Sequence, residues 1–149
     1  MSACIVPKEV IMSEMLEQAI SAAIADKLVL VVEDTSSSRI LVSGLVRGLG
    51  AHRVVSATDG VDALAKTIDK ELIPDIVLCD WVMPNMDGLE LLTRIKAAHA
   101  NVKFIMMTVK TEAEAVIMAR QHGVDGYVAK PFTRDSLMAS LAKVLGVTG

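Results

Sequence analysis

The chain alternates short apolar runs with longer segments in which apolar residues recur every three to four positions. That alternation predicts strands joined by helices, as in repeated βαβ units around a parallel sheet. The predicted strands are Leu28 to Glu33, Arg53 to Ala57, Asp75 to Asp80, Lys103 to Thr108 and Gly126 to Ala129. Because these runs are almost continuously apolar, we expect helices to cover both faces of the sheet.

Five helices are predicted between and after these strands. Two of them show apolar stripes at positions i, i+3, i+4 and i+7. The first stripe is Val42, Leu45, Val46 and Leu49, and the second is Val61, Leu64, Ala65 and Ile68. The other three are predicted over residues 88–98, 112–122 and 133–145. The pattern therefore predicts a doubly wound α/β domain with a five-stranded parallel sheet flanked by five helices.

Residues 1–26 precede this alternation and carry an apolar stripe of their own, formed by Met12, Met15, Leu16, Ala19, Ile20 and Ala23. The stripe predicts an extra amphipathic helix. Either the helix packs on the domain or frays, which we favour, or it contacts a second copy or a partner. We thus predict an N-terminal extension over 1–26 and one domain over 27–149.

Composition excludes several classes of protein. With a net charge of −3 and no cluster of Lys and Arg, the chain is not expected to bind nucleic acid through phosphate contacts. Cys4 and Cys79 lie far apart, and Cys79 follows the apolar run that begins at Ile76, which favours a buried thiol in a reducing cytoplasm. No uncharged apolar stretch is long enough for a membrane span, and glutamates interrupt the N-terminal segment, unlike a signal peptide.

Chemically reactive side chains gather where the predicted strands end. Glu33 and Asp34 follow the first strand, Asp80 ends the third, Thr108 ends the fourth and Lys130 follows the fifth. Ligand sites in open α/β sheets form at the carboxyl ends of the strands. We therefore expect the acids, the hydroxyl and the lysine to form one site.

Four segments that contain these residues resemble the receiver family of response regulators, closest to the single-domain chemotaxis regulators. They are Val31 to Asp34, Asp80 to Gly88, the strand end at Thr108, and Tyr127 to Phe132. Each piece alone is a weak signal, but four in this order at predicted strand ends are specific. The resemblance covers about residues 27 to 145 and implies a flavodoxin-like sheet with strand order 2-1-3-4-5.

The resemblance implies that Asp80 accepts a phosphoryl group in the presence of Mg²⁺. Carboxylates about 5 Å apart repel by roughly 3 kcal/mol per pair at an effective dielectric near 20, which a divalent cation relieves. An all-oxygen site that meets phosphate suits Mg²⁺. By the family pattern, Asp34, Asp80 and the backbone carbonyl of Val82 are direct ligands, while Glu33 acts through water.

The same pattern assigns roles to residues on the last two strands. Lys130 offsets the charge of the phosphoryl group, and the hydroxyl of Thr108 donates to it. Because that hydrogen bond exists only in the phosphorylated state, it can shift a two-state equilibrium. In the family, the motion of this hydroxyl is coupled to an aromatic side chain on the last strand, here Tyr127.

The expected function is that of a single-domain response regulator in two-component signalling, with chemotaxis as one pathway. Its partners would be a histidine kinase and a downstream effector, and its only catalysis would be its own phosphorylation and dephosphorylation. A relay that passes phosphate to a histidine phosphotransfer protein stays open. A phosphatase of the haloacid dehalogenase type would need a second acid where Val82 stands, and a nucleotide or flavin binder would need a glycine-rich loop.

Simpler interpretations compete for some of these residues. Glu33 and Asp34 could serve only as a helix cap, and Asp87 before Gly88 is expected to start a helix. The family pattern favours a cis peptide between Lys130 and Pro131. We expect the three histidines, His52, His99 and His122, at the surface, and Met83, Met86, Met106, Met107 and Met118 as fillers of core and loop gaps.

Two positions depart from what chemotaxis regulators commonly show. Val82 is apolar where a polar side chain is frequent, and Val109 is bulkier than the residue usual after Thr108. A polar group at position 82 would orient the attacking water, and a bulkier side chain at 109 narrows access to the phosphoryl group. We therefore expect slow self-dephosphorylation.

Overall fold

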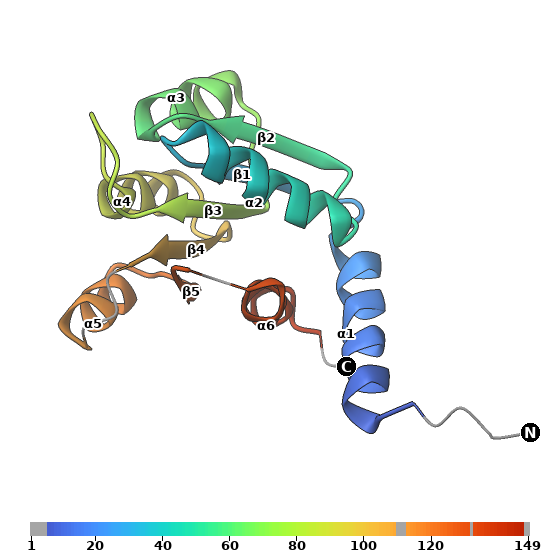
Figure 1. Ribbon diagram of the computed structural model, residues 1–149. Coiled ribbons are helices and arrows are strands. Elements are labelled where there is room, and N and C mark those ends of the chain that lie inside the picture. The colour runs from blue at the N-terminus through green and yellow to red at the C-terminus, as the bar shows by residue number, and fades with distance from the viewer. Residues whose placement is uncertain (1–5, 110–112, 132, 148–149) are drawn as a thin grey trace, which may run out of the picture.

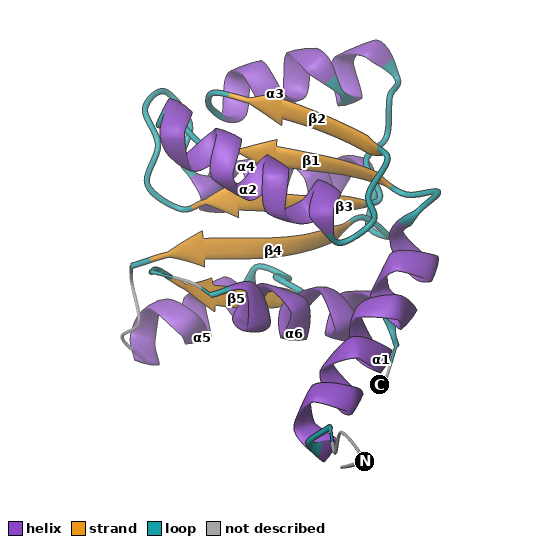
Figure 2. Cartoon of the chain, turned by 45° about the vertical axis from the view of Figure 1, so that its right-hand side comes forward, coloured by secondary structure: helices purple, strands orange, loops and turns teal. Residues whose placement is uncertain are grey.

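The computed structural model describes residues 6–109, 113–131 and 133–147. Its five strands form one sheet in the order β2-β1-β3-β4-β5, and every pair of neighbours is parallel. The common direction of the strands can be followed in Figure 2. The predicted sheet and strand order are confirmed.

The strands are β1 (Leu28–Val32), β2 (Arg53–Ala57), β3 (Ile76–Asp80), β4 (Lys103–Thr108) and β5 (Gly126–Ala129). They match the predicted runs except at two ends, where Glu33 and Asp75 lie just outside the ladder. The carboxylate of Asp75 still accepts a hydrogen bond from the backbone N–H of Leu28 at 2.8 Å. All of β1 and all but the last residue of β3 are buried, as expected for central strands covered on both faces.

The helices are α1 (Lys8–Ile24), α2 (Ser36–Gly48), α3 (Gly60–Lys66), α4 (Gly88–Ala98), α5 (Ala113–Gln121) and α6 (Arg134–Leu145), with a short 3-10 turn η1 (Ile68–Lys70). The helix predicted over 88–98 agrees with α4 at both ends. The predicted start of α5 at residue 112 lies outside the described residues, and so does Cys4. Among the described helices, none combines the length and the apolar run that crossing a bilayer requires.

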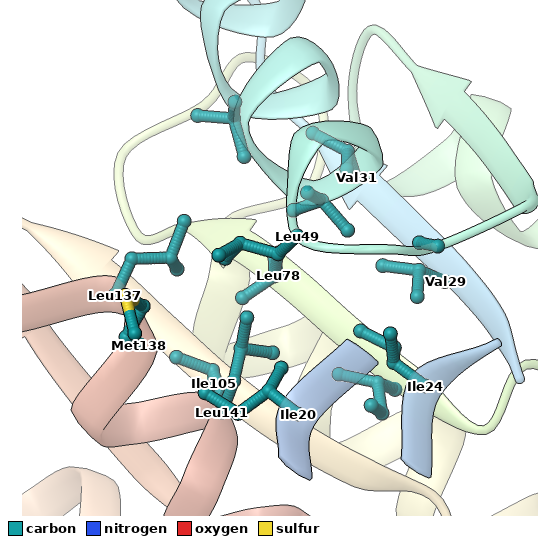
Figure 3. Close-up of a cluster of buried hydrophobic side chains, with 14 of the residues drawn as sticks. Ile20, Ile24, Val29, Val31, Leu49, Leu78, Ile105, Leu137, Met138 and Leu141 are labelled. Carbon is teal, nitrogen blue, oxygen red and sulfur yellow. The ribbon is translucent and has the colours of Figure 1, made fainter. Parts of the chain in front are cut away.

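Alternate residues of the strands pack against two separate helical layers. One apolar cluster joins α1, α2 and α6 to the sheet through Val29, Leu78 and Ile105 (Figure 3). The other joins α3, α4 and α5 to the opposite face through residues such as Val77 and Phe104. The result is the three-layer, doubly wound arrangement visible in Figure 1.

The helix α1 packs against α6 and ends just before β1, at the amino ends of the strands (Figures 1 and 2). Its Ile20 and Ile24 are fully buried, and Arg134 of α6 pairs with Glu17 at 2.5 Å. The expected packing on the domain is therefore observed. The predicted stripe is only partly on the buried face, because Met12 and Met15 are half exposed.

Two predictions about buried faces are wrong. In α3, Val61 and Ala65 are exposed while Ala63 is buried, because this short helix ends at Lys66 and rests on the sheet through a different face. Met118 is 45% exposed on the outer face of α5, whereas Met83, Met86, Met106 and Met107 fill the core as expected. The three histidines are exposed, as predicted.

Candidate functional site

Three acids meet at the carboxyl edge of the two central strands. Glu33 and Asp34 follow β1, and Asp80 ends β3, whose Cys79 pairs with Val32 of β1. Glu33, Asp34 and Asp80 each offer a carboxylate oxygen, and these three atoms lie within 4.8 Å of one another. The sheet order thus brings together three acids from positions 33, 34 and 80.

The three carboxylates differ in their exposure. Glu33 is only 1% exposed, Asp80 is partly buried and Asp34 faces solvent. The backbone carbonyl of Glu33 also accepts a hydrogen bond from Arg39 at 2.9 Å, which ties the start of α2 to the end of β1. The site is therefore a buried acid with two more accessible acids beside it.

Lys130 joins this cluster from the last strand. It follows β5, and its ammonium lies 2.5 Å from Glu33 and 3.4 Å from Asp80. Its backbone N–H donates to the carbonyl of Thr108 at 2.8 Å, and the peptide bond to Pro131 is cis, as predicted. The direct bond between Lys130 and Glu33 was not predicted, because nothing local to either segment signals a contact across 97 positions.

The surroundings of Glu33 and Lys130 raise the pKa of both side chains. Burial raises the pKa of Glu33 and the nearby charge of Asp80 adds to this, so that the pKa lies above its ordinary value despite the hydrogen bond from Lys130. Burial alone would lower the pKa of Lys130, but the bond to Glu33 and the charges of Glu33 and Asp80 outweigh it and raise the pKa. Lys130 is therefore a cation at neutral pH.

The donor set fits a hard divalent cation. Three carboxylates and one ammonium carry a net charge of −2, which one such ion would neutralise. Because Glu33 already binds Lys130, Asp34 and Asp80 are the carboxylates best placed as direct ligands. One or two carboxylates with an otherwise aqueous shell is the arrangement that Mg²⁺ prefers.

Thr108 and Tyr127 occupy the next two strands on the same side of the site. Thr108 ends β4, is 1% exposed and stands opposite Ala129 of β5 in the sheet register. Tyr127 lies two residues before Ala129 on β5. Its side chain is partly buried and packs against the apolar cluster under α3, α4 and α5. The two residues are thus placed on adjacent strands that end at the same edge of the sheet as the acidic cluster.

The loop from Asp80 to α4 begins at the acidic cluster. Trp81 is buried, whereas Val82 is 59% exposed and its N–H lies 3.4 Å from the carboxylate of Asp80. Gly88 closes the loop by donating to the carbonyl of Trp81 at 2.7 Å. A Cβ at position 88 would lie 2.4 Å from the backbone oxygen of Asp80, so only glycine fits this close approach.

Of the two helix caps considered for these residues, the one at Glu33 and Asp34 is wrong and the one at Asp87 is confirmed. The N-cap of α2 is Thr35, so neither Glu33 nor Asp34 holds the cap position. Asp87 does cap α4, accepting a hydrogen bond from the N–H of Glu90 at 2.8 Å, as expected. Cys79 is a buried free thiol, and its pKa lies well above the ordinary value because of burial and the charge of Asp80.

Comparison with known proteins identifies the family. The model of the response regulator receiver domain matches residues 29–142. The chain is 37% identical to the chemotaxis protein CheY-3 of Vibrio cholerae over 118 residues, which are 78% of this chain and 89% of the relative.

Solved structures agree. A structure of CheY4 from Vibrio cholerae is similar with a TM-score of 0.72 and 30% identity, over 79% of this chain and 98% of that chain. CheY in a CheX-CheY-BeF3-Mg complex from Borrelia burgdorferi is similar with a TM-score of 0.74 and 25% identity, over 79% and 88% of the two chains. The chain belongs to the CheY-like response regulator receiver domains, the receiving modules of two-component signalling.

Proposed function

We propose that this receiver domain is switched by phosphorylation of Asp80 in the presence of Mg²⁺, with a histidine kinase as the physiological donor. The observation that carries the proposal is the cluster of three carboxylates, with one oxygen of each within 4.8 Å of the others, and with Lys130 in ion pairs with Glu33 and Asp80. The solved relative bound to BeF3 and Mg supports the same chemistry by analogy. We also propose that the protein acts in the cytoplasm, with residues 1–26 as an extension outside the receiver domain.

In this proposal Asp80 is the nucleophile. A carboxylate oxygen of Asp80 bonds to the phosphorus of the donor while the bond from phosphorus to the leaving group breaks, and the leaving group departs with that electron pair. Asp80 suits this role because its carboxylate ends a central strand and is partly accessible. When bound, Mg²⁺ supplies charge neutralisation between the acids and the phosphoryl oxygens. Asp34, Asp80 and the carbonyl of Val82 would hold the ion directly, and Glu33 through water.

Lys130 and Thr108 would stabilise the product. The ammonium of Lys130 lies 3.4 Å from Asp80, so it can turn toward a phosphoryl oxygen without leaving the site. Thr108 would donate its hydroxyl to another phosphoryl oxygen, and Tyr127 on the adjacent strand would follow that movement. A contact made only in the phosphorylated state is what allows phosphorylation to shift the population of two conformations.

The output would be a change in protein contacts, to an effector or to a histidine phosphotransfer protein. The exposed Val82 cannot act as a proton donor two residues after Asp80, which disfavours turnover of a phosphomonoester substrate. The regulator is therefore proposed to catalyse only its own phosphorylation and dephosphorylation.

Intact mass spectrometry tests the proposal. After incubation with acetyl phosphate and MgCl2, the parent protein is expected to gain one phosphoryl group, and Asp80→Asn none. Asp87→Asn is the matched control, because Asp87 is an aspartate of the same loop that caps α4, and an Asn there can still cap. An unmodified parent, or an adduct that persists in Asp80→Asn, would contradict the proposal.

A further inference from the structure

The loop of residues 81–87 carries Val82, and its backbone is anchored mainly at its two ends. The N–H of Trp81 donates to the carbonyl of Met107 at 3.2 Å, and the N–H of Gly88 donates back to Trp81 at 2.7 Å. Val82 lies between these anchors and is largely exposed. The place of its carbonyl therefore depends on what restrains the middle of the loop.

Asn85 ties the middle of the loop to a different element. Its backbone is in the left-handed region, with φ at 67°, and its side-chain amide donates to the carboxylate of Asp59 at 2.8 Å. Asp59 is the N-cap of α3, and its other carboxylate oxygen accepts from the N–H of Asp62 at 2.8 Å. Because both oxygens of Asp59 are engaged, the acceptor that Asn85 meets is held in a defined direction.

A second contact lies directly beside the first. Met86 is 7% exposed and packs against Gly60, the first residue of α3. A Cβ at position 60 would lie only 2.8 Å from the sulfur of Met86, so the loop and the helix are in close contact there. Two successive loop residues thus dock on two successive residues at the start of α3.

We propose that Asp59 and Asn85 are positioning residues whose hydrogen bond holds the 81–87 loop and thereby fixes the place of the Val82 carbonyl. The inference rests on the proposed function, which makes that carbonyl a ligand of Mg²⁺. Neither residue belongs to the acidic cluster, and neither is proposed as a ligand of the ion. Groups that orient the ligands of a metal influence its affinity strongly, although they do not bind it themselves.

The test uses two substitutions of Asp59 that differ in whether the new side chain is long enough to contact Asn85. Asp59→Ser and Asp59→Asn remove the same charge, and both residues are good N-caps, so that α3 keeps its start. The Asn side chain can still exchange a hydrogen bond with Asn85, whereas the Ser hydroxyl is too short to reach it. MgCl2 is titrated into each variant of the full chain, and binding is measured by the fluorescence of Trp81 and by calorimetry.

We expect Asp59→Ser to bind Mg²⁺ about three- to tenfold more weakly than Asp59→Asn. With Asn85→Gly, which keeps the left-handed backbone but removes the amide, the two variants should agree within about twofold. Urea unfolding should give the same free energy for Asp59→Ser and Asp59→Asn. Equal Mg²⁺ affinities for the two variants in the presence of Asn85 would overturn the inference.

Amide hydrogen exchange without metal separates this inference from the proposed function. Asp59→Ser should speed exchange at Val82 and Met83 relative to Asp59→Asn, while exchange in β1 and β3 stays unchanged. If the parent fails to bind Mg²⁺, the proposed function is wrong, and the exchange rates still decide whether the hydrogen bond holds the loop. Identical exchange in both variants would show that it does not.

Discussion

Replacing Asp34 with Asn should stabilise the metal-free protein, although it removes a proposed Mg²⁺ ligand. The substitution keeps the shape of the side chain and deletes one of three clustered negative charges. The carboxylate atoms of the cluster lie within 4.8 Å of one another. At that separation each pair repels by about 3.5 kcal/mol at an effective dielectric near 20, and by about 0.9 kcal/mol in bulk water.

The expected gain in the free energy of unfolding is near the lower of these two values. Asp34 is exposed, so solvent screens its repulsion with Glu33 and with Asp80. It also precedes the N-terminus of α2, where a negative charge is favourable by about 0.3 to 1 kcal/mol. We therefore expect Asp34→Asn to raise the free energy of unfolding by about 1 kcal/mol in EDTA at low salt, with a smaller gain at high salt.

Magnesium should reverse the order of stability. An ion that binds only the folded state stabilises it by about 2.7 kcal/mol at one hundred times its dissociation constant. The parent should gain this amount and overtake Asp34→Asn, which has lost a proposed direct ligand. Urea unfolding followed by the fluorescence of Trp81, which is 5% exposed in the fold, measures both differences.

Asp69→Asn is the matched control for Asp34→Asn. Asp69 is an exposed aspartate on η1 that does not belong to the acidic cluster. Its replacement should change the stability by less than about 0.5 kcal/mol in EDTA and leave the effect of Mg²⁺ intact. The electrostatic reasoning fails if Asp34→Asn is less stable than the parent in EDTA, or if Mg²⁺ stabilises both proteins equally.

Three further outcomes are expected. Thr108→Ala should still be phosphorylated on Asp80, but BeF3 should no longer change hydrogen exchange in β5 and α5 as it does in the parent; equal changes would argue against the proposed switch. Val82→Asn should lose its phosphoryl group several-fold faster than the parent, because an amide can orient the attacking water, and an unchanged decay of the phosphorylated mass would contradict this. Asp125→Ala should lower the free energy of unfolding, measured by urea unfolding, by about 2 kcal/mol. The substitution deprives the partly buried Lys96 of its partner at 2.7 Å and the N–H of Phe104 of its acceptor at 2.9 Å. A loss below about 0.5 kcal/mol would show that water replaces both contacts.

The elements of the fold could be predicted because their signals are local. The continuous apolar runs of β1 and β3 reflect burial on both faces, which a central parallel strand requires wherever the rest of the chain lies. Likewise, Asp87 before Gly88 indicates a helix start from two neighbouring residues, and α4 begins there. The strand ends then pointed to Glu33, Asp34, Asp80 and Lys130 as one group.

Sequence by itself could not determine which face of a short helix is buried or which polar partners meet. Val61 and Met118 fall on exposed faces because the packing of α3 and α5 on the sheet, and not the spacing of apolar residues, decides what is covered. The pairs of Lys130 with Glu33 and of Asn85 with Asp59 join residues far apart in the chain, and no local pattern encodes such contacts. The apolar residues that let a strand be buried stand within the strand itself, so the sequence shows them directly. These hydrogen bonds, in contrast, exist only once the strand order has brought separate loops to the same edge of the sheet.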